Sequence, residues 1–185
     1  MEILCTNCCD HPLRSVEEEE NDMFGQLTSN FPKLFHYRAA ASFKESLELI
    51  LAELDKRQNG TVSPKKPIWW LVSRPELADM NNSGSLIIDL KELLQQGPRY
   101  NLHVLMWTSD VKQAQKLQFN KAMFKDRVCL EMTSEESKLV NGDELKLELA
   151  GYKAARIGQN TMKFRIYDQP DGKWMDSLFA RLSQF

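Results

Sequence analysis

The chain has 185 residues, 24 Lys and Arg against 26 Asp and Glu, a formal net charge of -2, and four cysteines, three of them near its start at Cys5, Cys8 and Cys9. This length suits one α/β domain, and the charge balance excludes a global electrostatic attraction to nucleic acid while leaving a local basic face open. The cysteine pattern excludes a secreted disulfide framework, and no apolar stretch approaches the roughly 20 residues that span a bilayer, so we expect a cytoplasmic protein without a membrane segment.

Residues 1–22 are expected to form a disordered or linker-like tail. They combine the cysteine cluster with the like-charge block Glu17 to Glu20, which favours a solvated segment. The remaining residues, 23–185, are expected to form one α/β domain. Its first part, 23–37, has apolar residues without a clear period and is predicted to be a loop with a short helical turn, because Pro32 interrupts any longer helix.

Regular elements follow in alternation. A helix is predicted over 42–58, where Ser42 and Glu45 form a capping box and Asn59-Gly60 ends the helix. The uninterrupted apolar run 68–72 predicts a buried strand. A second helix is predicted over 86–96, closed by Gly97-Pro98, and a second strand over 102–108.

The rhythm changes towards the C-terminus. A helix is predicted over 111–124 and a short strand over 127–132, followed by a β-hairpin of 152–157 with 162–168 and a last amphipathic helix over 174–182. The alternation of strands and helices predicts a mostly parallel sheet flanked by helices, with a C-terminal β-hairpin and helix.

Residues that follow strands are the first candidates for chemistry, because ligands of open α/β sheets bind beyond the carboxyl ends of the strands. Arg74, Glu76 and Asp79 follow the strand over 68–72, and Thr108 and Ser109 end the strand over 102–108. The simpler interpretation is structural: the acids complement the first turn of a helix, and the hydroxyls cap local backbone groups.

A family resemblance gives these residues a more specific interpretation. Pro75-Glu76-Leu77-Ala78-Asp79-Met80 resembles the Asp-Glu-Leu-Ala-Asp strand end of FtsK/SpoIIIE-type ATPases, with the first acid replaced by proline. Three later segments resemble family motifs in the same order: Gly97-Pro98-Arg99-Tyr100-Asn101-Leu102-His103-Val104 with Thr108-Ser109, Arg127-Val128-Cys129-Leu130-Glu131-Met132-Thr133-Ser134, and Gly151-Tyr152-Lys153-Ala154. The matched order runs from about Phe43 to Tyr167 and carries the resemblance.

The resemblance implies a partial RecA-like P-loop NTPase core, the C-terminal half of the motor. It implies that Glu76 and Asp79 form a degenerate Walker-B-like pair, that Thr108 and Ser109 lie where the family senses the γ-phosphate, and that Arg99 and Arg74 are candidates to complete a neighbouring subunit's nucleotide site. Surface arginines that only contact solvent are the commoner alternative.

The phosphate-binding loop is missing from the sequence. No Gly-x-x-x-x-Gly-Lys-Ser/Thr string occurs, so the backbone cradle and lysine that hold the phosphates are absent. ATP and Mg²⁺ are therefore expected only with a partner that supplies the loop, in a homo- or hetero-oligomer, with DNA as a possible substrate. The resulting hypothesis is a truncated or degenerate relative of an ATP-driven DNA or secretion translocase, not catalytic alone. The alternatives are an α/β interaction protein without a nucleotide role and a trans-acting subunit of a split motor.

A zinc-binding module is a third possibility, because Cys5-x-x-Cys8 has knuckle-like spacing with Cys9 and His11 nearby. A second Cys/His pair at a closing distance is missing, so we expect no metal site. His36 and His103 lack a partner at catalytic spacing, and Trp69-Trp70 is predicted to pack in the core.

Overall fold

The computed structural model describes residues 2–8, 29–31, 33–38, 43–75, 78, 84–116, 123–142, 153–165 and 172–182. The chain divides into two compact units, Met1–Asp110 and Val111–Phe185. Residues 23–185 are predicted from the sequence to form one domain, whereas the strands after residue 110 form a separate antiparallel sheet and do not extend the parallel one.

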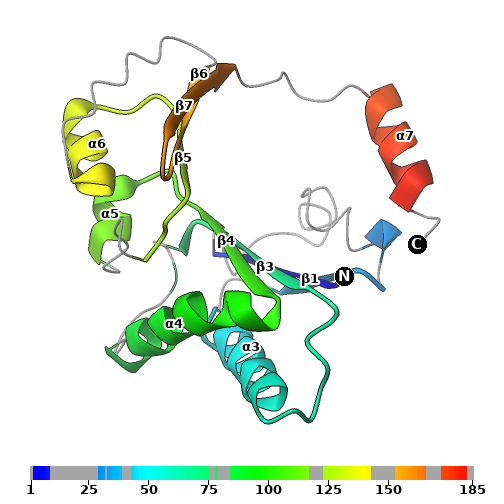
Figure 1. Ribbon diagram of the computed structural model, residues 1–185. Helices are drawn as coiled ribbons and strands as arrows, with labels where there is room; N and C mark the ends of the chain where they lie inside the picture. Colours follow the sequence, from blue (N-terminus) through cyan, green and yellow to red (C-terminus); the bar gives the residue numbers. More distant parts are fainter. Residues whose placement is uncertain are drawn as a thin grey trace. The chain divides into compact units, whose positions relative to one another are not determined.

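The first unit is built on a four-stranded parallel sheet with the order β2-β1-β3-β4. Its strands are β1 (Glu2–Asn7), β2 (Phe35–Arg38), β3 (Ile68–Ser73) and β4 (Leu102–Trp107). Its helices are α3 (Phe43–Gln58), α4 (Gly84–Gln96) and the short 3-10 helix η3 (Gly97–Tyr100). Both α3 and α4 lie on the same face of the sheet (Figure 1).

Four predicted elements of this unit are confirmed with small changes at their ends. Helix α3 ends at Gln58, and Gly60 then has a φ of 72°, a conformation that glycine adopts without a Cβ penalty. Strands β3 and β4 and helix α4 occupy the predicted segments, and Gly97 packs closely enough that a Cβ there would lie 2.9 Å from the carbonyl oxygen of Leu102. A side chain at position 97 would therefore disturb the turn that leads into β4.

The structure differs from the sequence analysis at the start of the chain. Residues 2–7, expected to be part of a tail, form strand β1 between β2 and β3, and Cys5 on it is fully buried. Residues 35–37, expected to lie in a loop, belong to β2. Both segments are short: β2 pairs with β1, and β1 pairs with β3 and contacts α3. Pairing between distant segments is not revealed by local sequence patterns. The remainder of the predicted tail, residues 9–22, lies outside the described residues.

The core between sheet and helices contains a buried polar network. The Trp70 indole Nε1–H donates to Oγ1 of Thr6 at 3.0 Å, and the Thr6 hydroxyl donates to Oγ of Ser46 at 3.0 Å. All three side chains are fully buried, and the Trp70 ring lies 5.3 Å from that of Phe43 between ring centres. The network joins β1, β3 and α3, so it fixes the register of the helix on the sheet.

Arg57 ties the end of α3 to the loops that lead into β3 and β4. Its Nε–H donates to Glu53 Oε1 at 2.8 Å, and its Nη1–H groups donate to the carbonyl oxygens of Lys66 at 3.0 Å and Tyr100 at 2.7 Å. The Arg57 side chain is only 3% exposed, although Glu53 is 22% exposed. One buried guanidinium thus satisfies backbone carbonyls from two separate segments.

The second unit contains a three-stranded antiparallel sheet in the order β5-β6-β7. Its elements are β5 (Arg127–Cys129), β6 (Lys153–Ile157), β7 (Thr161–Arg165), α5 (Val111–Lys116), α6 (Ser134–Asn141) and α7 (Gly172–Leu182). The predicted hairpin and last helix are confirmed within the described residues. The strand predicted over 127–132 is shorter, and it pairs with the hairpin and not with the parallel sheet.

Helix α6 was not predicted, although its sequence carries a start signal. Oγ1 of Thr133 accepts from the backbone N–H of Glu136 at 3.2 Å, and Oε2 of Glu136 accepts from the backbone N–H of Thr133 at 2.8 Å, so the two residues form a capping box. At the other end, Oδ1 of Asn141 accepts from Nε of Arg127 at 3.2 Å, which joins α6 to β5.

Cys129 is buried beside Asn141 on this unit. Burial raises the pKa of the Cys129 thiol, an effect that the Asn141 hydrogen bond and the charge of Arg127 only partly offset.

Because the folded state holds the Cys129 proton more tightly than the unfolded chain does, the contribution of this thiol to stability is complete below the ordinary thiol pKa. It is lost as pH rises through the higher folded value. We expect Cys129→Ala to make the alkaline decline of unfolding free energy shallower, and urea titrations of both proteins across that pH range check it. If the unfolding free energies of the two proteins decline in parallel, ionisation of the Cys129 thiol does not contribute to the loss of stability.

Candidate functional site

The candidate site is the edge of the parallel sheet where the strands of the first unit end. All four strands are parallel, so their carboxyl ends meet at one edge, the usual place for ligands in sheets of this kind. Backbone pairing continues past the strands: the N–H of Cys8 donates to the Ser73 carbonyl at 2.9 Å, and the N–H of Arg74 donates to the Trp107 carbonyl at 2.8 Å. The residues that follow β1, β3 and β4 are therefore held side by side.

Arg74 has an unusual backbone at this edge. Its φ is 50°, in the left-handed region that non-glycine residues rarely adopt, and it is followed by the buried Pro75. Such a conformation costs on the order of 1 kcal/mol and persists only where the surroundings enforce it, here through the bond to Trp107. The strained turn redirects the chain away from β3 at the point where the sequence analysis placed the candidate acids.

Thr108 and Ser109 follow β4 at the same edge, and both are exposed. Oγ1 of Thr108 accepts from the backbone N–H of Asp110 at 3.1 Å, so this hydroxyl caps the local turn, as the simpler interpretation of the sequence expected. Arg74, Thr108 and Ser109 are thus brought to one edge. A guanidinium and hydroxyls in that position have the chemistry to bind an anion.

Arg99 lies at the opposite end of the strands, where β4 begins. It is an exposed residue of η3, which leads into the amino end of β4, whereas Thr108 and Ser109 follow its carboxyl end. Six strand residues span about 20 Å, so Arg99 is separated from the strand-end group by roughly the length of β4. The structure does not bring Arg99 to the same site as Arg74.

The two candidate acids, Glu76 and Asp79, lie outside the described residues. Within the part of the chain that the structure describes, no three His, Cys, Asp or Glu side chains gather in a way that could hold a metal ion. The sequence has no phosphate loop, and the described residues do not form a complete site for a nucleotide and its Mg²⁺.

The zinc possibility also lacks geometric support. Cys5 is buried inside β1, and Cys8 follows its end. A Cys-x-x-Cys knuckle places both thiols in one turn, whereas Cys5 lies within a paired strand. Cys9 and His11 lie outside the described residues.

The buried start of the chain contributes Cys8 to this edge, which was not predicted from the sequence. Cys8 and Ser73 are both buried where β1 and β3 end, and the Cys8 N–H contacts the Ser73 carbonyl. The apolar run Ile3-Leu4-Cys5 was the available signal for β1. It was outweighed by the cysteine cluster and acidic block that follow it.

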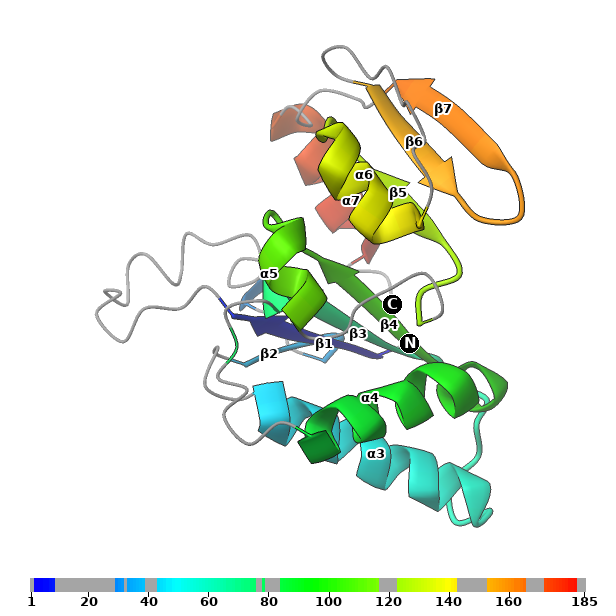
Figure 2. The same ribbon diagram turned by 90° about the vertical axis from the view of Figure 1, so that its left-hand side faces the viewer.

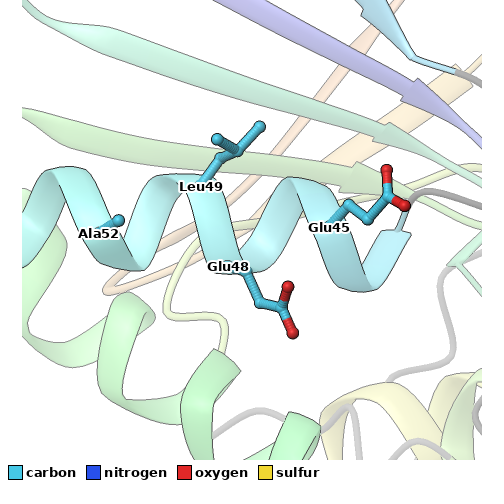
Figure 3. A pocket seen from close by; sticks show the side chains of 4 residues that line it. All are labelled: Glu45, Glu48, Leu49 and Ala52. Carbon is cyan, nitrogen blue, oxygen red and sulfur yellow. The ribbon is translucent and has the colours of Figure 1, made fainter.

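A hollow on the surface of α3 is a weaker candidate. Figure 3 shows it with the residues Glu45, Glu48, Leu49 and Ala52, all from one helix. Ligand sites usually combine side chains from several elements, and none of the sequence-predicted site residues lines this hollow. We therefore assign no ligand to it.

No protein-family model matches the chain, and no curated protein matches it at a significant level. The family resemblance accordingly depends on the quoted residues and their order. In addition, none of the described helices is long and apolar enough to cross a membrane.

Proposed function

We propose that this chain is a non-catalytic relative of the C-terminal half of an FtsK/SpoIIIE-type motor core, and that it acts with a loop-bearing ATPase subunit. The observation that carries the proposal is the order of the matched segments, combined with the position of Arg74, Thr108 and Ser109 at one edge of a parallel sheet. The family function would be ATP-driven movement of DNA, or of protein in secretion relatives.

The place of Arg99 supports a role in trans. An arginine that completes a neighbouring subunit's site has to project away from the site of its own subunit. Arg99 is exposed and separated by the length of β4 from the strand-end group of its own chain. Arg74, by contrast, lies within that group and is the better candidate to contact a ligand bound there.

Arg99→Ala tests this role in a mixture of the purified chain with an FtsK-type subunit that has an intact phosphate loop. We expect the stimulated ATP turnover to fall by about 10³-fold, the lower end of what trans-acting arginines contribute. Lys65→Ala, which also removes an exposed cation from the amino side of the sheet, serves as the control and should leave the stimulated rate unchanged. Equal rates for wild type and Arg99→Ala would remove Arg99 from the mechanism.

An α/β interaction protein without a nucleotide role is the second candidate. It is favoured by exposed apolar side chains on the sheet, since Leu105 and Trp107 of β4 and Trp69 of β3 are all partly accessible. In register, Trp69 lies opposite His103, and their rings stack at 4.5 Å. Absence of nucleotide binding, even with a loop-bearing partner, would favour this candidate.

A further inference from the structure

The β-hairpin of the second unit concentrates positive charge. Strands β6 and β7 are joined by 158–160 and run antiparallel (Figure 2). Between positions 153 and 165 the sequence has four basic residues and no acidic one, in a chain whose formal net charge is -2: Lys153, Arg156, Lys163 and Arg165. The hairpin is therefore a local basic element on a chain that is slightly acidic overall.

Strand β7 is the edge of this sheet, and all of its side chains are exposed. Alternation along the strand places Lys163 and Arg165 on one face and Met162 and Phe164 on the other. Among the described residues neither Lys163 nor Arg165 forms an ion pair, whereas Arg156 is held by Asp126 at 2.7 Å. Lys163 and Arg165 are consequently available to an external anion.

Apolar side chains accompany these charges. Met162 is 60% exposed, Phe164 43% and Val128 62%. The pairings Val128 with Arg156 and Arg156 with Met162 place Val128, Arg156 and Met162 in one row across the sheet. One face of β7 thus carries Lys163 and Arg165, and the other carries Met162 and Phe164 beside Arg156, whose charge is paired with Asp126.

Charged residues on an edge strand also have a purely protective role, since they discourage pairing with other sheets. That role requires neither an exposed Phe164 nor the complete absence of acids from the hairpin. Cations that neutralise phosphates, interleaved with an aromatic side chain on which a base can stack, are the combination that binds nucleic acid.

We infer that the β6–β7 hairpin is a nucleic-acid contact, in which Lys163 and Arg165 bind backbone phosphates and Phe164 stacks on a base of single-stranded DNA. The inference deepens the proposed function by assigning a DNA contact to the second unit, and it rests on that function only for the choice of DNA as ligand. Lys163 and Arg165 can bind the phosphates of single-stranded and duplex DNA alike, whereas Phe164 can stack only on a base that is not paired in a duplex. Binding of both forms of DNA therefore tests the two cations, and the difference between the forms tests Phe164.

The test measures binding of the full chain to a fluorescently labelled 20-nucleotide single strand and to the corresponding duplex by anisotropy, over a range of salt concentrations. The variant Lys163→Glu/Arg165→Glu is expected to bind both at least about tenfold more weakly. The slope of log affinity against log salt should become shallower by about 1.5 to 2, because two phosphate contacts are lost. Phe164→Ala is expected to weaken binding of the single strand by about tenfold and of the duplex much less.

The matched control is Lys65→Glu/Lys66→Glu, which makes the same charge change at two exposed positions of the first unit. It should change affinity by less than about twofold, since it removes no phosphate contact of the hairpin. An equal loss in both double variants, or no binding at low salt, would overturn the inference. So would competition by polyglutamate as strong as by DNA of equal charge, because that outcome would assign the hairpin to an acidic protein partner. The proposed function is tested separately by ATP turnover with a loop-bearing subunit, measured without DNA. Failure of DNA binding by the hairpin can therefore be distinguished from failure of the proposed function.

Discussion

Replacing Arg57 by methionine is expected to lower the free energy of unfolding by about 2–4 kcal/mol. Methionine retains the apolar stem but leaves the carbonyl oxygens of Lys66 and Tyr100 without the guanidinium that they accept from. Because Arg57 is buried, water does not replace these bonds at low cost. Urea-induced unfolding followed by circular dichroism measures the loss.

Two further variants separate the contributions. Arg57→Lys keeps the charge but lacks the planar fork, so it should lose most of the same stability. Glu53→Gln should lose much less, since Glu53 is partly exposed and the two carbonyl contacts of Arg57 remain. A cost for Glu53→Gln as large as that for Arg57→Met would show that the ion pair, and not the carbonyl contacts, joins α3 to the loops.

Trp70→Ala is expected to destabilise the first unit by about 3–5 kcal/mol, the range found for removing a large buried aromatic side chain. The substitution opens a cavity beside Phe43 and removes the indole N–H that Thr6 accepts from. Thermal and urea unfolding of the full chain measure the effect.

The neighbouring residue provides the control. Trp69→Ala changes the same chemical group at the adjacent position, but Trp69 is 38% exposed and stacks on His103 at the sheet surface. Its expected cost is about 1 kcal/mol or less. Trp70→Phe should be intermediate, because it keeps an aromatic ring in the core but loses part of the packing and the hydrogen bond. Equal costs for the two alanine variants would contradict the assignment of Trp70 to the core and Trp69 to the surface.

The middle of the chain could be predicted from sequence because its signals are local. The apolar stripe of α3, its stop at Gly60 and the apolar runs of β3 and β4 all depend on spacing within one element. The prediction that Trp69 and Trp70 both pack in the core was right for Trp70 only. A continuous apolar run does not tell which face of a sheet is covered, and here α3 and α4 cover the face that holds Trp70.

The elements that were missed depend on pairing between distant segments. Strand β1 pairs with residues of β2 and β3 that lie 32 and 66 positions away in the sequence, so the short apolar run Ile3-Leu4-Cys5 was only a weak local signal for it. Helix α6 is a different case, since the capping box of Thr133 and Glu136 was legible in the sequence and was passed over in favour of a longer strand.

The candidate site could be predicted in part. Residues that follow parallel strands had to meet at one edge, which places Arg74 near Thr108 and Ser109. Arg99 precedes β4 and had to lie at the opposite edge by the same logic. The strained φ of Arg74 could not be predicted, because it arises from the bond between its N–H and Trp107 and from the proline that follows.

Steady-state ATP turnover tests the central proposal most directly. The purified chain with Mg²⁺ would be measured alone, and then mixed with an FtsK-type subunit that carries an intact phosphate loop. We expect no turnover by the chain alone and stimulation in the mixture that is lost with Glu76→Gln or Arg99→Ala. If the chain shows no nucleotide binding and no stimulation under any of these conditions, that result contradicts a role in a motor and leaves an α/β protein whose function is to bind other molecules.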